Sequence, residues 1–375
     1  MRNTWYTVVG LAWITASGCS AASKAPGAAV TDAGDAAVDG HVDGHVKDLP
    51  DGPVMLPRGA PGIEFDDIQF GPGLRKVIVP AGRTGSVVLI DPDTSAMTEI
   101  KGLQGSDKYT PVPGTGTVRS GTRYGSTSAT EAGQYVAALD CTAKTLNILD
   151  PVAATIVASV ALGGASDYVH YVASMHELWV TNPNASGIDL YSLPASGTPT
   201  PVKLGSFAVT AGPESLAIDE ARGHAYTNTF FGGKTDVIDL KTRKVVETWS
   251  NGCVLALGVT MDEKRGFAFV SCGDSGDVVV LDAKNHGATL SRLNGGHGTN
   301  ILAYSPSLKH VYSASGNTKE VFVMAVADSG ELSLLGKLPG ADRGFSVAAD
   351  DRGHVWVIDP DHGQILRGTD KFPVR

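Results

Sequence analysis

The chain has 375 residues, of which 42% are hydrophobic and 18% charged, and it contains 46 glycines and 20 prolines. This composition favours short strands joined by tight turns over helices, which carry more Ala, Leu, Glu and Lys. The net charge is −9 and no Lys/Arg-rich run occurs. We therefore expect no nucleic-acid partner, because phosphate binding needs clustered positive charge.

Residues 1–19 have the pattern of an export signal. Arg2 supplies a positive charge, and the apolar run WYTVVGLAWI (5–14) is too short to span a bilayer as a stable helix. The following TASGCS resembles a bacterial lipobox, in which the signal is cut before the cysteine and its thiol, here Cys19, is lipidated. That resemblance implies an outer-membrane lipoprotein of the cell envelope, facing the periplasm or the surface. A plain secretory signal is the alternative, and it also places the mature chain outside the cytoplasm.

Residues 20–62 are rich in Ala, Gly, Asp and Pro and contain almost nothing to bury. This composition predicts a flexible, solvated tether. His41 and His45 lie within it, but two histidines without a folded frame make only a weak metal site. We therefore expect no metal there.

From residue 63 onward, an apolar strand that often ends in aspartate recurs. Three successive intervals between copies are 43 residues long, and only the first interval, of 59 residues, departs far from this period. The copies end at Asp91, Asp150, Ser192, Asp239, Asp282, Ala325 and Gly368. Since each copy meets the same turn, the repeated aspartate is expected to cap that turn and not to act as a catalytic acid.

Three further apolar segments accompany each copy, such as FSVAAD (345–350) and HVWVID (354–359) before it and KVVETW (244–249) after it. Four short strands in about 43 residues are typical of a propeller blade. A four-stranded sheet that is apolar on both faces cannot bury either one alone, and stacking around an axis covers both. The β-branched and aromatic runs exclude a helical solenoid. Seven copies predict seven blades.

Two segments, LWVTN (178–182) and AYTN (225–228), resemble the signature of the YVTN-type β-propeller repeats. VIDLKTRKVVET (237–248) is similar to the third and fourth strands of that family. The resemblance implies an all-β, seven-bladed β-propeller with four-stranded antiparallel blades over residues 63–375. It implies little about chemistry, because the family includes binding proteins, surface proteins and cofactor-bearing enzymes.

The seventh unit supplies only three strands, so a strand from the N-terminal side is expected to close the last blade. PVMLPRG (53–59) is the preferred candidate. GIEFDD (62–67) is expected to serve instead as the innermost strand of the first blade.

The long first interval places about 16 extra residues within 105–130. This connection runs from the fourth strand of one blade to the first strand of the next, across the face from which propellers usually bind. A long loop inside a compact domain is functional or mobile. Arg119, Arg123 and Tyr124 are therefore candidate binding residues.

At one end of a propeller channel, the connections between blades meet those between second and third strands. His170, Glu214, His297 and Arg343 are expected there and are the candidate catalytic residues. Propeller lactonases resemble this chain in blade number and repeat style, and such side chains would polarise a ring ester and position water. The alternative is that all four are ordinary polar loop residues.

Asp167, Asn182 and Asn228 are the candidate binding residues at the same end of the channel. Asparagine at a strand end most often serves the turn itself, since it tolerates left-handed backbone geometry.

The cysteines allow one internal pairing. Cys253 begins a strand that turns at residues 261–266, and Cys272 ends the returning strand, so the two are expected nearly opposite each other. An exported location permits a disulfide between them. Cys141 is then left over and is expected to be an unpaired surface cysteine, with a reactive or metal-binding thiol as the alternative.

Several chemistries lack their motifs. The chain has no C-x-x-C-H for covalent haem, no G-x-S-x-G and no H-E-x-x-H, and GGHG (295–298) lacks the strand-to-helix context of a phosphate loop. We therefore expect a monomeric binding module without cofactor, which recognises a protein or glycan of the cell envelope and meets the membrane only through its lipid anchor. A lactonase-type hydrolase is the first alternative and a cofactor-bearing periplasmic redox protein the second.

Overall fold

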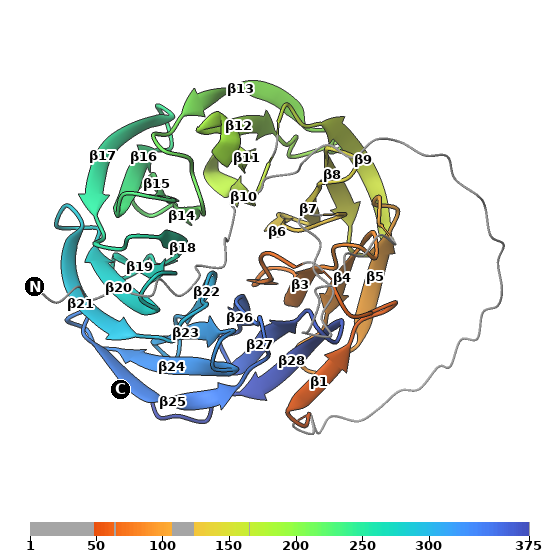
Figure 1. The fold of residues 1–375 in the computed structure, drawn as a ribbon. Coiled ribbons are helices and arrows are strands. Elements are labelled where there is room, and N and C mark those ends of the chain that lie inside the picture. The colour runs from red at the N-terminus through yellow and green to blue at the C-terminus, as the bar shows by residue number, and fades with distance from the viewer. Residues whose placement is uncertain (1–48, 64, 107–123, 165, 375) are drawn as a thin grey trace, which may run out of the picture.

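A computed structural model describes residues 49–63, 65–106, 124–164 and 166–374. The strands of these residues form seven four-stranded antiparallel sheets, arranged as blades around a central axis (Figure 1). The expected all-β, seven-bladed β-propeller is confirmed. The helical segments in this part are two single-turn 3-10 helices, η1 (Ala173–Met175) and η2 (Pro183–Ala185).

Each blade runs outward from an innermost strand at the axis, and in the first six the strands follow chain order. The first blade contains β2 (Gln69–Gly71), β3 (Lys76–Pro80), β4 (Ser86–Ile90) and β5 (Met97–Lys101). The second contains β6 (Ala129–Ala132), β7 (Tyr135–Asp140), β8 (Thr145–Asp150) and β9 (Thr155–Ala161). The third contains β10 (Val169–Val172), β11 (Glu177–Asn182), β12 (Gly187–Ser192) and β13 (Val202–Ala208).

The remaining blades repeat this order up to the seventh. The fourth contains β14 (Ala217–Asp219), β15 (His224–Thr229), β16 (Lys234–Asp239) and β17 (Lys244–Ser250). The fifth contains β18 (Ala256–Asp262), β19 (Phe267–Cys272), β20 (Asp277–Asp282) and β21 (Ala288–Asn294). The sixth contains β22 (Leu302–Ser305), β23 (His310–Ser315), β24 (Glu320–Val326) and β25 (Leu332–Pro339). The seventh contains β26 (Val347–Ala349), β27 (His354–Asp359), β28 (Gln364–Thr369) and β1 (Gly52–Met55).

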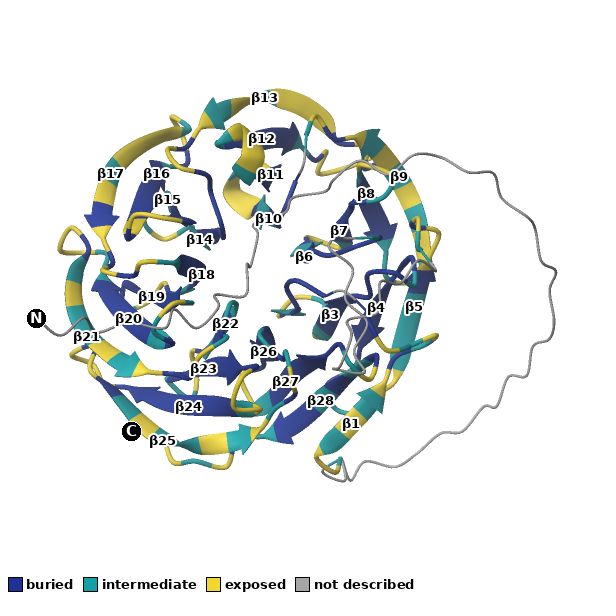
Figure 2. Ribbon diagram, viewed as in Figure 1, coloured by how far each residue is buried: buried dark blue, intermediate teal, exposed yellow. Residues whose placement is uncertain are grey.

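The hydrophobic core lies between blades. In β3, Val77 and Val79 pack toward the seventh blade, while Ile78, between them, packs toward the second. This is the two-residue period of a strand with both faces covered. The middle strands are buried along their length, whereas outermost strands such as β9 alternate between exposed and half-buried residues (Figure 2). No blade could bury its apolar faces without its neighbours.

The last blade is closed by β1, which pairs antiparallel with β28 (Figure 1). The predicted closing strand (53–59) is thus in place. The propeller consequently starts before the boundary at residue 63, within the stretch expected to be tether. Leu56, directly after β1, is 4% exposed and packs in the cluster between the seventh and first blades.

The innermost strand of the first blade is β2, so its expected position at residues 62–67 is wrong. Gln69 pairs with Ile78 and Gly71 with Lys76, which leaves a short hairpin turn before β3. A strand at 62–67 would leave too long a connection for that tight pairing. Asp66 and Asp67 therefore precede the strand and lie at the channel.

The aspartates that end the third strands cap the following turns, as expected. Asp91 Oδ1 accepts hydrogen bonds from the backbone N–H groups of Asp93 and Thr94, both at 3.0 Å. Asp150 Oδ1 accepts one from Val152 N–H at 2.8 Å, and Asp239 Oδ1 accepts one from Thr242 N–H at 2.7 Å. The recurrence of this residue is therefore structural.

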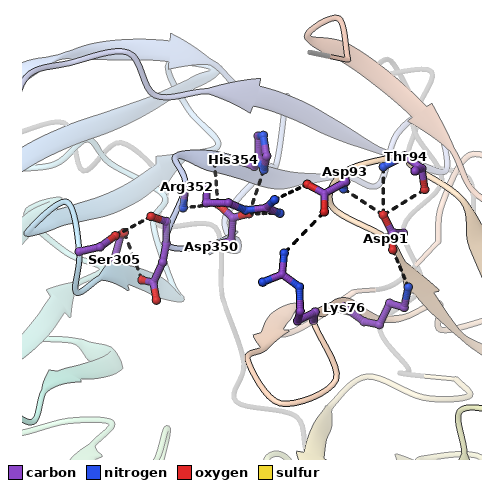
Figure 3. Close-up of polar contacts among 11 residues, drawn as sticks. Lys76, Asp91, Asp93, Thr94, Ser305, Asp350, Arg352 and His354 are labelled. Carbon is purple, nitrogen blue, oxygen red and sulfur yellow. Dashed lines mark hydrogen bonds and ion pairs between the residues drawn. The ribbon is translucent and has the colours of Figure 1, made fainter. Parts of the chain in front are cut away.

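Charged side chains also join neighbouring blades (Figure 3). Asp350 accepts the backbone N–H groups of Arg352 and His354, both at 2.9 Å, and its carboxylate lies 2.8 Å from His354 Nδ1. Arg352 pairs in turn with Asp93 of the first blade. The arginine thus stabilises both its own turn and the joint between the first and last blades.

Candidate functional site

The two ends of the propeller are built from different connections. We call the end formed by the connections between blades and between second and third strands, such as residues 251–255 and 230–233, the loop face. We call the opposite end, formed by hairpins such as residues 220–223 and 263–266, the turn face. The sequence places the candidate residues at the loop face.

Tyr168 closes the central channel at the loop face. Its hydroxyl donates to Asp66 Oδ1 at 3.3 Å and accepts from Asn300 Nδ2 at 3.5 Å. These three residues precede the innermost strands of the third, first and sixth blades. A side chain that contacts blades so far apart in the ring must lie across the axis. Tyr168 and Asp66 are each only 1% exposed.

Asp67 lies at the same level and is 2% exposed. Its Oδ2 accepts hydrogen bonds from Gln69 Nε2 at 2.8 Å and Ser128 Oγ at 3.3 Å. Its Oδ1 has no hydrogen-bond partner among the described residues. Burial raises the pKa of Asp67 to about 7, and repulsion from Asp167 acts in the same direction.

Next to Tyr168 the channel contains a cavity of about 350 Å³, lined by residues of all seven innermost strands or the connections that enter them. At the loop-face end it is bounded by Asp67, Tyr168 and Ser215, which are 1–4% exposed. At the other end it is lined by Tyr171 and Glu263, which are half-buried and exposed respectively. The cavity therefore opens on the turn face, opposite the end where ligand binding was expected.

The four candidate catalytic residues have separate surroundings. His170 lines the cavity, and burial lowers its pKa to about 4, so its imidazole is neutral at pH 7. Glu214 is 4% exposed, and its backbone N–H donates to Asn228 O at 2.9 Å. His297 is exposed on a loop-face turn, and Arg343 Nε donates to Asp361 at 2.9 Å. Of these four candidates, His170 is the one that lines the cavity. The lining of the cavity therefore includes one of the four residues that the lactonase alternative needs.

Two of the candidate binding residues lie within the fold. Asp167 is fully buried, and its charge acts on Asp67. Asn182 is 6% exposed, and its side chain accepts the backbone N–H of Ala185 at 3.4 Å. Asn182 thus caps η2, in agreement with the turn interpretation.

Asn228 joins two blades and is not available to a ligand. It is fully buried, and its Nδ2 donates to Leu257 O at 2.7 Å and Gly258 O at 3.1 Å in the next blade. Its Oδ1 accepts from Thr235 Oγ1 at 2.8 Å. The interpretation of Asn228 as a binding residue is therefore corrected to that of a blade-to-blade contact.

Of the candidates in the long connection, Arg119 and Arg123 lie outside the described residues. Tyr124 is half-buried, with the guanidinium of Arg83 lying 5.1 Å from the centre of its ring. The arginine side chain therefore covers part of this aromatic surface.

Of the two predictions about the cysteines, the pairing is confirmed and the unpaired surface cysteine is not. The structure contains the disulfide between Cys253 and Cys272 that the spacing predicted, with 5.1 Å between the Cα atoms. Cys141 is 1% exposed and is not a free thiol. The expectation of an unpaired surface cysteine is therefore wrong.

An exposed apolar pair on the loop face was not anticipated from the sequence. Phe231 and Val254 are 66% and 69% exposed, and Phe231 pairs through its backbone with Leu255 beside Val254. The ring of Phe230, which is 7% exposed, packs edge-on against Phe231 with 4.5 Å between ring centres. The sequence signal for this pair was the doubled aromatic in TFFGG (229–233). Successive residues of an extended chain point to opposite sides, so when the ring of Phe230 enters the core, that of Phe231 does not. We call Phe231 and Val254 the apolar pair.

Neither a metal cluster nor a membrane helix is found in the described ranges. No group of three or more His, Cys, Asp or Glu side chains there could hold a metal ion. No helix in the same part of the chain is both long and apolar enough to cross a bilayer.

Comparison with solved structures agrees with the fold. A chain of the mitotic checkpoint complex has a TM-score of 0.65 and 14% identity, covering 88% of this chain and 99% of its own. Hydrazine synthase of Kuenenia stuttgartiensis has a TM-score of 0.65 and 13% identity, covering 89% and 100%. The β-propeller domain of Myceliophteria thermophila Cps50 (Swd1) has a TM-score of 0.65 and 12% identity, covering 86% and 100%. No protein-family model and no curated protein matches the chain.

Proposed function

We propose that this chain is an exported, lipid-anchored propeller of the YVTN type that binds a protein partner in the cell envelope through its loop face. The observation that carries the proposal is the apolar pair, Phe231 and Val254, which are 66% and 69% exposed. Binding energy at protein interfaces concentrates in a few such residues, often aromatic, near the centre of the contact.

The surroundings of the apolar pair support a preformed contact site. Phe231 is held by its backbone pairing with Leu255 and by the ring of Phe230. The neighbouring connection is fixed by the disulfide at Cys253. A site that is already ordered loses little conformational entropy on binding. The similar propeller in the mitotic checkpoint complex belongs to a protein assembly, which supports an interaction role for this scaffold.

Substitution of Phe231 by Glu is expected to reduce capture of the partner at least about tenfold, since losing an aromatic anchor typically costs 2 kcal/mol or more. The measurement is quantitative cross-linking of the purified, tagged chain to envelope extracts, followed by mass spectrometry. Val246→Glu is the matched control, because Val246 is 50% exposed on the outermost strand β17, away from the loop face. Equal capture by wild type and Phe231→Glu would refute the proposed binding face, and capture of a glycan in place of a protein would change the partner class.

Anchoring is tested separately at Cys19, which lies outside the described residues. The proposal rests on Arg2, the apolar run 5–14 and the small residues before Cys19. The sequence has four cysteines and Cys141 is not a free thiol, so lipidation requires that Cys19 is not the partner of Cys141 in the mature chain. Cys19→Ser is expected to abolish incorporation of labelled palmitate and to move the protein from the membrane to the soluble fraction, because stable anchoring depends on the acyl chains. Unchanged labelling or fractionation of the variant would rule out this anchor without touching the loop-face proposal.

A further inference from the structure

The central cavity has the construction of a small-molecule site. Its volume is about 350 Å³, within the roughly 300–1,000 Å³ typical of ligand pockets. Its walls are the innermost strands of the ring, which are held in place by the blades behind them. Tyr168 closes one end, and the other opens on the turn face, away from the apolar pair. A ligand could therefore bind here independently of a partner on the loop face.

The charge around the cavity favours a cation. Asp67 and Glu263 are the acidic residues that line it, and no lysine or arginine is found among its described lining residues. Two arginines in the turn-face hairpins of the fourth and fifth blades are engaged, since Arg222 pairs with Asp219 and Arg265 with Asp262. A concave site lined by one sign of charge attracts ligands of the opposite sign.

The closed end lacks one hydrogen-bond donor. Asp67 is 2% exposed and lines the cavity, and its Oδ1 has no hydrogen-bond partner in the described part of the chain. A buried carboxylate oxygen without a partner is costly. An ammonium group of a ligand would supply both the missing donor and the opposite charge.

Apolar and aromatic side chains form part of the walls between this end and the mouth, beside polar groups. Phe70, Ile218 and Tyr304 line the cavity from the first, fourth and sixth blades and are half-buried. They would cover a hydrophobic body, and aromatic faces also attract an adjacent cation. We propose that the central cavity binds a small molecule that carries a positively charged amino group on an apolar or aromatic body, with Asp67 as the acceptor for the amino group.

Titration calorimetry with tryptamine and tryptophol tests this proposal, because the two probes share the indole ring and differ in the charged amino group. Tryptamine is expected to bind the full chain at one site with a Kd below about 1 mM, at least about tenfold more tightly than tryptophol. Asp67→Asn is expected to remove the preference. Asp236→Asn is the matched control, since Asp236 is also 2% exposed with an unpartnered Oδ2 but does not line the cavity. Binding of neither probe, equal binding of both, or a preference that survives Asp67→Asn would overturn the proposal.

A second variant keeps the test independent of how well Asp67→Asn folds. Ile218→Trp is expected to narrow the cavity and weaken tryptamine binding at least about tenfold, while leaving Asp67 in place. Val246→Trp, on the exposed outer strand, should bind tryptamine as the wild type does. Unchanged binding by Ile218→Trp would show that tryptamine binds elsewhere. Capture of a protein partner through Phe231 is not expected to change in either cavity variant, so the two proposals can fail separately.

Discussion

At pH 8, Asp67→Asn is expected to raise the free energy of unfolding by roughly 2–4 kcal/mol, while at pH 4 it should leave it almost unchanged. Burial, with repulsion from Asp167, raises the pKa of Asp67 from 3.8 to about 7 in the folded chain. Between about pH 4 and 7 the unfolded chain releases this proton first, so the stability falls as the pH rises and the loss is complete above pH 7. At about 1.4 kcal/mol for each pKa unit, the upper limit is roughly 4 kcal/mol. Asparagine mimics the protonated acid and avoids this loss.

Urea denaturation of wild type and variant at pH 4, 6 and 8 provides the measurement. Asp370→Asn is a control of opposite sign. Burial alone would raise the pKa of Asp370, but hydrogen bonds from His310 Nδ1 and Tyr312 Oη, both at 2.7 Å, lower it. Asp370 therefore stabilises the folded chain above pH 4, and its replacement should destabilise the protein at pH 8. If Asp67→Asn were equally stabilising at pH 4 and pH 8, the raised pKa would be wrong.

Leu56→Asp is expected to lower the free energy of unfolding by at least roughly 3 kcal/mol and to cause self-association. Leu56 is 4% exposed between the seventh and first blades, so the substitution leaves a cavity and also buries a carboxylate. Loss of this anchor should release β1 from β28 and expose an unpaired strand edge, which favours edge-to-edge association. Chemical denaturation and light scattering after size exclusion measure the two effects.

The neighbouring residue provides the control for that experiment. Met55 lies in β1 itself but is 55% exposed. Met55→Asp should change the stability by less than about 0.5 kcal/mol and leave the chain monomeric. Equal effects of the two substitutions would show that strand closure does not depend on the packing of Leu56.

Asp67 connects stability with the proposed ligand site. A buried acid with an unpartnered oxygen lowers the stability of the free protein above pH 4, and it is also the group that an amino ligand would satisfy. Residues that are unfavourable for folding and strongly shifted in pKa concentrate at functional sites. A stabilising effect of Asp67→Asn together with loss of tryptamine binding would therefore agree with both arguments.

The architecture could be predicted from the sequence because it depends on local, repeated patterns. Strand alternation and turn residues recur in every blade, and a period close to 43 residues recurs along most of the chain. Each blade must also bury two apolar faces against its neighbours. The closing strand at residues 53–59 followed from the missing fourth strand of the last unit, and the turn-capping aspartates followed from their fixed place after a strand. Inter-blade contacts such as that of Asn228 were not visible, because an asparagine at a strand end looks the same whether it serves a turn or the next blade.

The sequence by itself therefore determined the number of blades, the order of their strands and the Cys253–Cys272 pairing, all of which depend on neighbours along the chain. Only the tertiary structure decided which polar residues meet at the axis. Asp66, Tyr168 and Asn300 are separated by more than 100 residues and come together because three blades point inward to one place. Asp67 reaches that axis, whereas His297 turns to the surface. The closure of the whole ring decides between these positions, because the strand pattern of a single blade fixes spacing along the chain and not position around the axis.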